Sequence, residues 1–100
     1  IACGDGWFDL IDELCGEIQN RVENENRRNP KEKFTCEATQ VKEKFGGLRF
    51  YIYGGDDYID GLISMAETLS YMICSECGKQ SSKNKEERGW IYTLCNNCRK

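Results

Sequence analysis

Residues 74–100 read CSECGKQSSKNKEERGWIYTLCNNCRK and contain two Cys-x-x-Cys pairs that are 17 residues apart. Two cysteines with two residues between them can bend around one ion, and a second pair returning from elsewhere in the fold completes a tetrahedron of thiolates. This spacing is typical of a zinc site. We therefore expect one Zn²⁺ held by four ligands: Cys74, Cys77, Cys95 and Cys98.

The expected metal site is closed. Four thiolates fill the tetrahedron and leave no position for water or substrate, so we expect the zinc to be structural. Iron in an all-sulfur site suits the same ligands and stays open as an alternative. A redox-active pair is disfavoured, because neither pair opens a helix after a strand. Only two residues follow Cys98, which favours a zinc ribbon, with two knuckles and a short hairpin, over a treble clef. Gly78 suits the positive φ that often closes a knuckle.

Size and composition indicate one globular domain. The chain has 100 residues, of which 39% are hydrophobic and 31% charged. We find no membrane-spanning run and no signal peptide. Because the first residue is Ile1 rather than Met, we expect either a trimmed chain or a natural start upstream. The seven cysteines are an odd number, which argues against a fully paired disulfide framework and favours a reduced, cytoplasmic protein.

Upstream of the cysteines the pattern alternates between helix and strand. Apolar residues recur at steps of three and four over residues 5–24, which predicts a helix with Asp5 as its N-cap. Residues 24–33 contain the only proline and are expected to form a loop. Period-two alternation over residues 34–53 predicts a β-hairpin around Gly46 and Gly47.

A second helix is expected to start at Asp56 or Asp57, as its N-cap, and to run directly into Cys74. Residues 79–88 are predicted to form a polar loop and residues 89–94 a short strand that leads to Cys95. The fold class is therefore α+β: a helix, a β-hairpin and a helix, followed by a small four-cysteine zinc ribbon.

We expect residues 1–73 to form the α+β core and residues 74–100 to form the zinc ribbon packed on it, as one compact unit. Both helices would pack on the apolar face of the hairpin, and Trp90, Ile91 and Leu94 would connect the ribbon to the core. Gly16 would mark close packing of the first helix. The predicted buried residues are Trp7, Ile11, Leu14, Leu48, Phe50, Ile52, Leu62 and Leu69.

Three further cysteines lie outside the two pairs. Cys15 falls on the apolar face of the first predicted helix, and Cys36 falls on the apolar side of its strand. We expect both to be buried as small hydrophobic residues. Cys3 is near the chain start and could be exposed. A nucleophilic role is disfavoured for all three, because the chain has no histidine to act as the neighbouring base.

Basic and aromatic residues interleave over residues 41–53. By strand parity Arg49, Tyr51 and Tyr53 share one face of the hairpin, with Lys42 and Lys44 nearby. Such a face can bind a partner protein, because Tyr and Arg are favoured at interface hot spots, or it can stack and pair with nucleic acid. It can also be an ordinary solvated face of an antiparallel sheet. If the protein grips a partner protein, we expect these five residues to make the contact.

Three motifs together resemble a group of small bacterial and phage-encoded proteins with a C-terminal four-cysteine zinc ribbon. They are GDGW at residues 4–7, VKEKFGGLRFY at residues 41–51 and the cysteine pairs with GWIYTL at residues 89–94. The resemblance covers most of the chain. It implies a bacterial or phage intracellular protein whose chain here lacks an N-terminal piece, and it implies no particular activity.

Charge and metal chemistry rank the possible functions. The formal net charge is −3, with −6 in residues 1–73 and +3 in residues 74–100. We expect a non-catalytic zinc protein that acts by protein–protein interaction and is phage or prophage encoded. The alternative is a nucleic-acid-binding regulator that uses the zinc ribbon and the face of Lys42, Lys44 and Arg49. A closed metal site and the absence of histidine argue against an enzyme.

Overall fold

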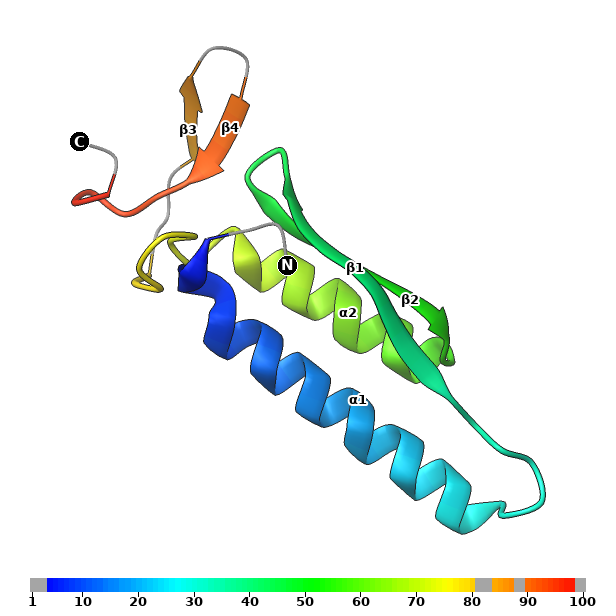
Figure 1. The fold of residues 1–100 in the computed structure, drawn as a ribbon. Coiled ribbons are helices and arrows are strands. Elements are labelled where there is room, and N and C mark those ends of the chain that lie inside the picture. The colour runs from blue at the N-terminus through cyan, green and yellow to red at the C-terminus, as the bar shows by residue number, and fades with distance from the viewer. Residues whose placement is uncertain (1–3, 81–83, 88–89, 99–100) are drawn as a thin grey trace.

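A computed structural model describes residues 4–80, 84–87 and 90–98. A 3₁₀ turn, Asp5–Trp7, leads into α1, Phe8–Arg28. Strands β1, Cys36–Lys44, and β2, Gly47–Gly54, form an antiparallel hairpin, and α2, Asp57–Ser70, follows. A second hairpin, β3 Asn84–Glu87 and β4 Trp90–Thr93, completes the order (Figure 1). The predicted α+β fold with a helix, a hairpin, a helix and a C-terminal cysteine cluster is confirmed.

Helix α1 is longer than predicted and starts differently. Asp5 belongs to the 3₁₀ turn and does not cap α1, whose N-cap residue is Trp7 without a side-chain cap bond. The helix continues to Arg28, so residues 24–28, expected in a loop, are helical. Ion pairs one turn apart stabilise this polar end, because Glu25 bonds both Arg21 at 3.2 Å and Arg28 at 2.7 Å. The helix ends two residues before Pro30.

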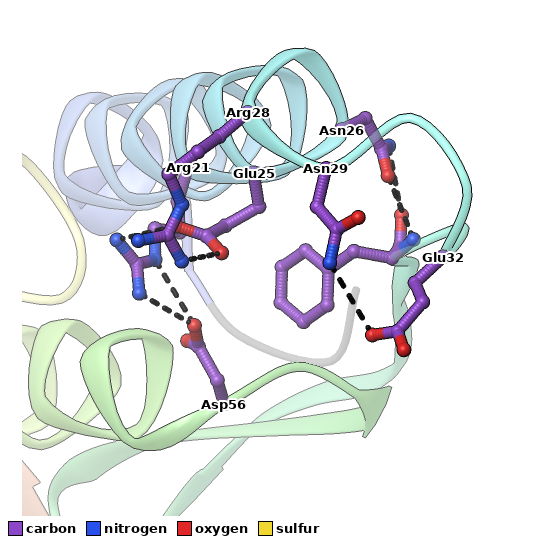
Figure 2. A network of polar contacts seen from close by, with 8 residues as sticks. Arg21, Glu25, Asn26, Arg28, Asn29, Glu32 and Asp56 are labelled. Carbon is purple, nitrogen blue, oxygen red and sulfur yellow. Dashed lines mark hydrogen bonds and ion pairs between the residues drawn. The ribbon is translucent and has the colours of Figure 1, made fainter.

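A polar network fixes the end of α1 against the elements that follow it (Figure 2). Arg21 donates through Nε and Nη2 to one carboxylate oxygen of Asp56 at 3.0 and 2.8 Å. Asn26 makes two bonds with the backbone of Phe34, donating to its carbonyl oxygen at 2.9 Å and accepting from its N–H at 2.7 Å. The loop between α1 and β1 is therefore held at the helix end, and α1 is joined to the start of α2.

The hairpin turn is one residue earlier than predicted. Lys44 pairs with Gly47, so the two turn residues are Phe45 and Gly46, with φ of 53° and 80°. Positive φ at both central positions is characteristic of the type I′ turn, which suits the twist of a two-residue hairpin. Gly46 adopts this conformation easily, whereas a non-glycine residue such as Phe45 does so at a cost.

A β-bulge in β1 determines which side chains face outward. The pairing shifts between Ala38 and Gln40, so Thr39 is the extra residue. Ala38 lies opposite Ile52, on the apolar face, but Val41 lies opposite Phe50 on that same face. Without the bulge, residues 42 and 44 would continue the parity of Cys36 and Ala38 and point at the core. The bulge places Lys42 and Lys44 on the outer face instead.

Helix α2 packs between α1 and the hairpin (Figure 1). The predicted cap is confirmed at Asp56, whose carboxylate accepts from the Ile59 N–H at 3.0 Å. The helix ends at Ser70 and does not run directly into Cys74. Its last turns cover the edge of β2: Leu48 N–H donates to Ser70 Oγ at 2.8 Å and Phe50 N–H to a Glu67 oxygen at 3.0 Å. These bonds satisfy donors that a strand edge leaves open.

The core contains most of the residues predicted for it. Ile52 and Leu62 are half-buried at its margin, while Leu69 is 38% exposed because it lies on the outer side of α2. Cys15 is exposed, and Cys36 is half-buried against the core, so the expected burial is wrong for Cys15. Gly16 has nothing within 4 Å of an added Cβ, so it does not mark close packing. The buried core residues are Trp7, Ile11, Leu14, Ile18, Leu48, Phe50, Ile59, Ile63 and Ala66.

The C-terminal segment forms the short hairpin expected of a zinc ribbon. β4 matches the predicted strand, but β3 falls inside residues 79–88, which were predicted to form a loop. Asn84 pairs with Thr93 and Glu87 with Trp90. Residues 81–83 and 88–89 of that predicted loop, and Cys3, lie outside the described residues. Within the described ranges, none of the helices combines the length and apolar character needed to cross a bilayer.

Candidate metal centre

Cys74 and Cys77 lie on a tight backbone turn that follows α2. The Gly78 N–H donates to the Cys74 carbonyl at 2.9 Å, and the Cys74 N–H donates to the Lys79 carbonyl at 2.7 Å. Gly78 has φ of 83°, so the positive φ expected at this position is present. The turn brings the Cys77 side chain back toward that of Cys74, which is the geometry of a metal knuckle.

Cys95 and Cys98 form a similar turn after β4. The Cys98 N–H donates to the Cys95 carbonyl at 3.1 Å. The Ser75 N–H donates to the Thr93 carbonyl at 2.9 Å, which joins the first turn to the strand that leads into the second. Backbone bonds therefore hold the two Cys-x-x-Cys pairs face to face, although 17 residues separate them in the chain.

The four sulfur atoms form one cluster. All four Sγ atoms lie within 4.8 Å of one another, and those of Cys77 and Cys95 are 3.5 Å apart. Zinc–sulfur bonds of about 2.3 Å in a tetrahedron require sulfur–sulfur distances of about 3.8 Å. All four are free thiols rather than disulfides. The cluster can therefore hold a metal ion with little adjustment, and its ligand set fits zinc.

Backbone N–H groups donate hydrogen bonds to the sulfur atoms of Cys74 and Cys95. Burial acts to raise the pKa of Cys74, but hydrogen bonds from the N–H groups of Cys95, Cys77 and Glu76 outweigh it and lower this pKa to about 6. Backbone donors, Cys98 N–H first, also lower the pKa of Cys95. These bonds favour thiolates, the form that binds metal.

The pKa values of the other two thiols, Cys98 and Cys77, are raised. Hydrogen bonds with the thiols of Cys95, Cys74 and Cys77 raise the pKa of Cys98 to about 12. A hydrogen bond from the Lys79 N–H lowers the pKa of Cys77, but burial and hydrogen bonds with the thiols of Cys95 and Cys74 outweigh it, so this pKa is also raised. Four thiolates cannot share this volume without a compensating charge, and a divalent cation supplies that charge.

The N-terminal GDGW segment packs on the first knuckle, a role that the sequence pattern did not reveal. Gly6 N–H donates to the Ser75 carbonyl at 2.8 Å, and Trp7 Nε1 donates to the Ile73 carbonyl at 2.9 Å. A Cβ on Gly6 would overlap the Cys74 carbonyl oxygen, and one on Gly4 would overlap that of Ser75. Glycine is therefore required at both positions because the two backbones touch.

The turn of the first hairpin contacts the second hairpin. Thr93 Oγ1 donates to the Gly46 carbonyl at 2.6 Å, and a Cβ on Gly46 would lie 3.1 Å from the Ile91 side chain. Thr93 and Leu94 are buried. The approach of Gly46 agrees with the packing expected for Ile91. Leu94 instead packs with Cys74 and Cys95 in a cluster separate from the main core, and nothing is described for the Trp90 side chain. The metal centre is therefore tied to the core through the chain start and the hairpin turn.

The five predicted partner-binding residues come together on the outer face of the first hairpin. Lys42 lies directly opposite Arg49 in the pairing, and its ammonium is 5.6 Å from the centroid of the Tyr51 ring. Tyr51 is 42% and Tyr53 74% exposed. Lys44 is exposed at the end of the strand, beside the Phe45 ring. Arg49 donates to the Tyr71 hydroxyl at 3.3 Å, so the end of α2 fixes its position.

Comparison with protein-family models, with curated proteins and with solved structures found no match for this chain. The assignment of the cysteine cluster as a candidate metal site therefore rests on the geometry described above. The resemblance to bacterial and phage proteins is not supported by any relative that these comparisons found.

Proposed function

We propose that this is a non-catalytic, zinc-stabilised protein that acts by binding another protein through the outer face of its first hairpin. The metal is zinc and its role is architectural, because four cysteines occupy every position of a tetrahedral site. Zinc would fix the fold of the C-terminal segment. That segment in turn holds the turn of the first hairpin in place, because Thr93 donates a hydrogen bond to the Gly46 carbonyl. The binding face consists of Lys42, Lys44, Arg49, Tyr51 and Tyr53.

The observation that carries this proposal is the direct pairing of Lys42 with Arg49 across the hairpin. Like charges directly opposite each other destabilise a sheet. Neither cation forms an ion pair with a carboxylate in the part of the chain that the structure describes. The β-bulge at Thr39 places Lys42 on the outer face of the hairpin, beside exposed tyrosines. An acidic patch on a partner would offset the repulsion, and Tyr51 and Tyr53 would supply apolar contact.

Nucleic acid is the alternative ligand, since phosphates also pair with cations and bases stack on tyrosine. Three cations are a small phosphate footprint on a chain with a net charge of −3. We therefore favour a protein partner. Binding to mixed DNA and RNA at low ionic strength that falls steeply with added salt would support the alternative and contradict the proposal.

The test is affinity capture by the zinc-loaded protein from nuclease-treated lysate, followed by measurement of affinity for the captured partner. Arg49→Ala and Tyr51→Ala are each expected to weaken binding at least tenfold, as hot-spot truncations do. Arg27→Ala is the matched control, because Arg27 is exposed on α1 and bonds only Asn24 among the described contacts. Equal affinity of all variants would remove this face from the proposal.

We also propose a bacterial or phage origin and a cytoplasmic location. The first follows from the three motifs quoted above, and the second from the odd number of cysteines and the spacing of the two pairs, which favour metal-binding thiolates over a disulfide framework. The test for location is fractionation of cells that express the tagged chain. Recovery in an oxidising compartment with Cys74, Cys77, Cys95 and Cys98 in disulfides would contradict the second.

A further inference from the structure

Helix α2 carries two apolar stripes rather than one. The first, Ile59, Ile63, Ala66 and the buried Ser70, faces the core. The second has the same alternating spacing of four and three residues but is rotated by about 100° around the helix, since each of its four members on α2 precedes one of the first stripe. We call it the outer stripe; its members are Tyr58, Leu62, Met65 and Leu69 on α2 and Met72 in the turn that follows the helix.

The outer stripe is open to solvent. Tyr58, Met65, Leu69 and Met72 are 52%, 61%, 38% and 47% exposed, and Leu62 is half-buried. Arg21 of α1 stacks on the Tyr58 ring and Leu62 packs against the core, whereas Met65, Leu69 and Met72 stay exposed. Single exposed apolar residues are common, but a continuous row of large ones on one helix marks an interaction site. Two of the five are methionines, which adapt well to apolar partners.

The spacing of the outer stripe specifies the shape of its ligand. Positions 58, 62, 65, 69 and 72 follow the 3.5-residue repeat with which two helices pack side by side. From Tyr58 to Leu69 the stripe is about 17 Å long, at about 1.5 Å per residue, and Met72 extends it into the turn after α2. A partner helix of about four turns, with its own apolar residues at the same repeat, would cover it.

Charge specifies the flanks of that helix. Residues 57–73 contain no lysine or arginine. Of their three acidic residues, Asp57 is the nearest to the stripe, whereas Asp60 and Glu67 lie on the opposite side of α2, where Glu67 accepts from the Phe50 N–H. The first turns of α1, residues 8–20, lie beside α2 and contain four acidic residues and no basic one. Arg21 stacks on Tyr58 at 4.6 Å, but Asp56 and Glu25 already pair with it. A second copy of this chain would bring two acidic surfaces together, whereas a basic helix complements this one.

We propose that the outer stripe is a second docking surface, which binds an amphipathic helix with lysine or arginine flanking its apolar side. This surface is separate from the hairpin face and would give the protein two partners of opposite charge. The mode is the packing of one helix against an apolar helical surface, in which the apolar anchors supply affinity and the flanking charges supply selectivity.

The test uses the zinc-loaded protein and a labelled synthetic peptide of 21 residues, about six turns by helix geometry, with Leu at the first and fourth heptad positions and Lys at the flanking ones. Lys at both flanks keeps this peptide from pairing with itself. Fluorescence anisotropy in about 0.15 M salt, where the screening length is about 8 Å, measures its affinity. A peptide of the same composition in scrambled order is the peptide control, and we expect it to bind at least tenfold more weakly.

Uncharged variants separate the apolar contact from general attraction between charges. Met65→Gln with Leu69→Gln keeps side-chain length, charge and helix propensity, and we expect at least a tenfold loss of affinity. Ser64→Gln, on an exposed position of the same helix outside the stripe, is expected to change affinity less than twofold. Circular dichroism and zinc content check that all variants are folded.

Three outcomes would overturn the proposal. The first is equal binding of the ordered and scrambled peptides, and the second is equal affinity of the stripe variant and Ser64→Gln. The third is concentration-dependent dimerisation in sedimentation equilibrium that the stripe variant abolishes, because it would assign the surface to a second copy of this chain. Failure of Arg49→Ala to affect the hairpin partner would leave this result unchanged, so the two proposals fail separately.

Discussion

The indole N–H of Trp7 donates to the carbonyl of Ile73 at 2.9 Å, so the start of α1 is bonded to the residue that precedes the first cysteine of the sulfur cluster. Trp7 is fully buried in the main core. The bond joins segments 66 residues apart and makes the position of the first knuckle depend on the core. Conversely, we expect a change at the cysteine cluster to disturb the packing of Trp7.

Metal removal is therefore expected to perturb more than the C-terminal segment. We expect one zinc per chain by elemental analysis, loss of zinc on chelation, and a red shift of tryptophan fluorescence in a Trp90→Phe variant, in which Trp7 is the remaining tryptophan, as Trp7 loses its packing. Cys95→Ser is expected to lack stoichiometric zinc. Cys15→Ser is the matched control, because Cys15 is exposed on α1 and outside the cluster. Full zinc content in Cys95→Ser would contradict the four-thiolate site.

The glycine that touches the knuckle provides a second test. Gly6→Ala is expected to destabilise the protein by about 1–3 kcal/mol, because its Cβ would overlap the Cys74 carbonyl and force the backbones apart. Gly16→Ala, in the middle of α1, has nothing within 4 Å of its Cβ and is expected to stabilise by about 1 kcal/mol. Urea denaturation of both zinc-loaded variants measures the difference. A Gly6→Ala protein as stable as the parent, or more stable, would refute the close contact.

The contacts of Trp7 and Gly6 with the first knuckle could not be predicted from the sequence. The period of the apolar residues predicted both helices and the hairpin, and the Cys-x-x-Cys spacing predicted the sulfur cluster, because both are local patterns with a direct geometric meaning. The role of Gly6 depends on a residue 68 positions away, the carbonyl of Cys74, and no local pattern encodes that approach. Leu69 was assigned to the core because periodicity alone does not say that α2 has a second, open stripe.

The bulge at Thr39 was likewise invisible in the sequence. Strict alternation from Cys36 would have put Lys42 and Lys44 toward the core, and only the extra residue reconciles the apolar start of β1 with its basic end. The same shift turns Glu43 inward, opposite Leu48. The one inserted residue, Thr39, therefore places Lys42 and Lys44 on the candidate binding face and places the Glu43 carboxylate at the margin of the core.

Glu43 is expected to make stability depend on pH. Burial, with a smaller contribution from Glu76, raises the pKa of Glu43, and its Oε2 has no hydrogen-bond partner among the residues that the structure describes. The folded protein then binds this proton more tightly than the unfolded chain, so the stability contribution is present at low pH and is lost as pH rises through the folded pKa. Glu43→Gln is expected to be more stable than the parent at pH 7, with an advantage that shrinks toward pH 5.

The matched control for this effect is Glu37→Gln, an exposed position on the outward side of the same strand. Denaturation midpoints of the three zinc-loaded proteins between pH 5 and 8 give the comparison, and protonation of the cysteines affects all three alike. A constant difference between Glu43→Gln and the parent across this range would show that Glu43 does not titrate as the structure implies.

The hairpin turn offers a last test, because it contains the one non-glycine residue with positive φ among those described. Phe45 has φ of 53° and a side chain that is 62% exposed, so its backbone cost is not offset by burial. Phe45→Asn is expected to stabilise the protein by about 0.5–1 kcal/mol, because Asn followed by Gly is the preferred pair in a type I′ turn. Thermal unfolding measures this gain. A loss of stability would mean that the Phe45 ring, which lies 5.6 Å from the Lys44 ammonium, contributes more than the strain costs.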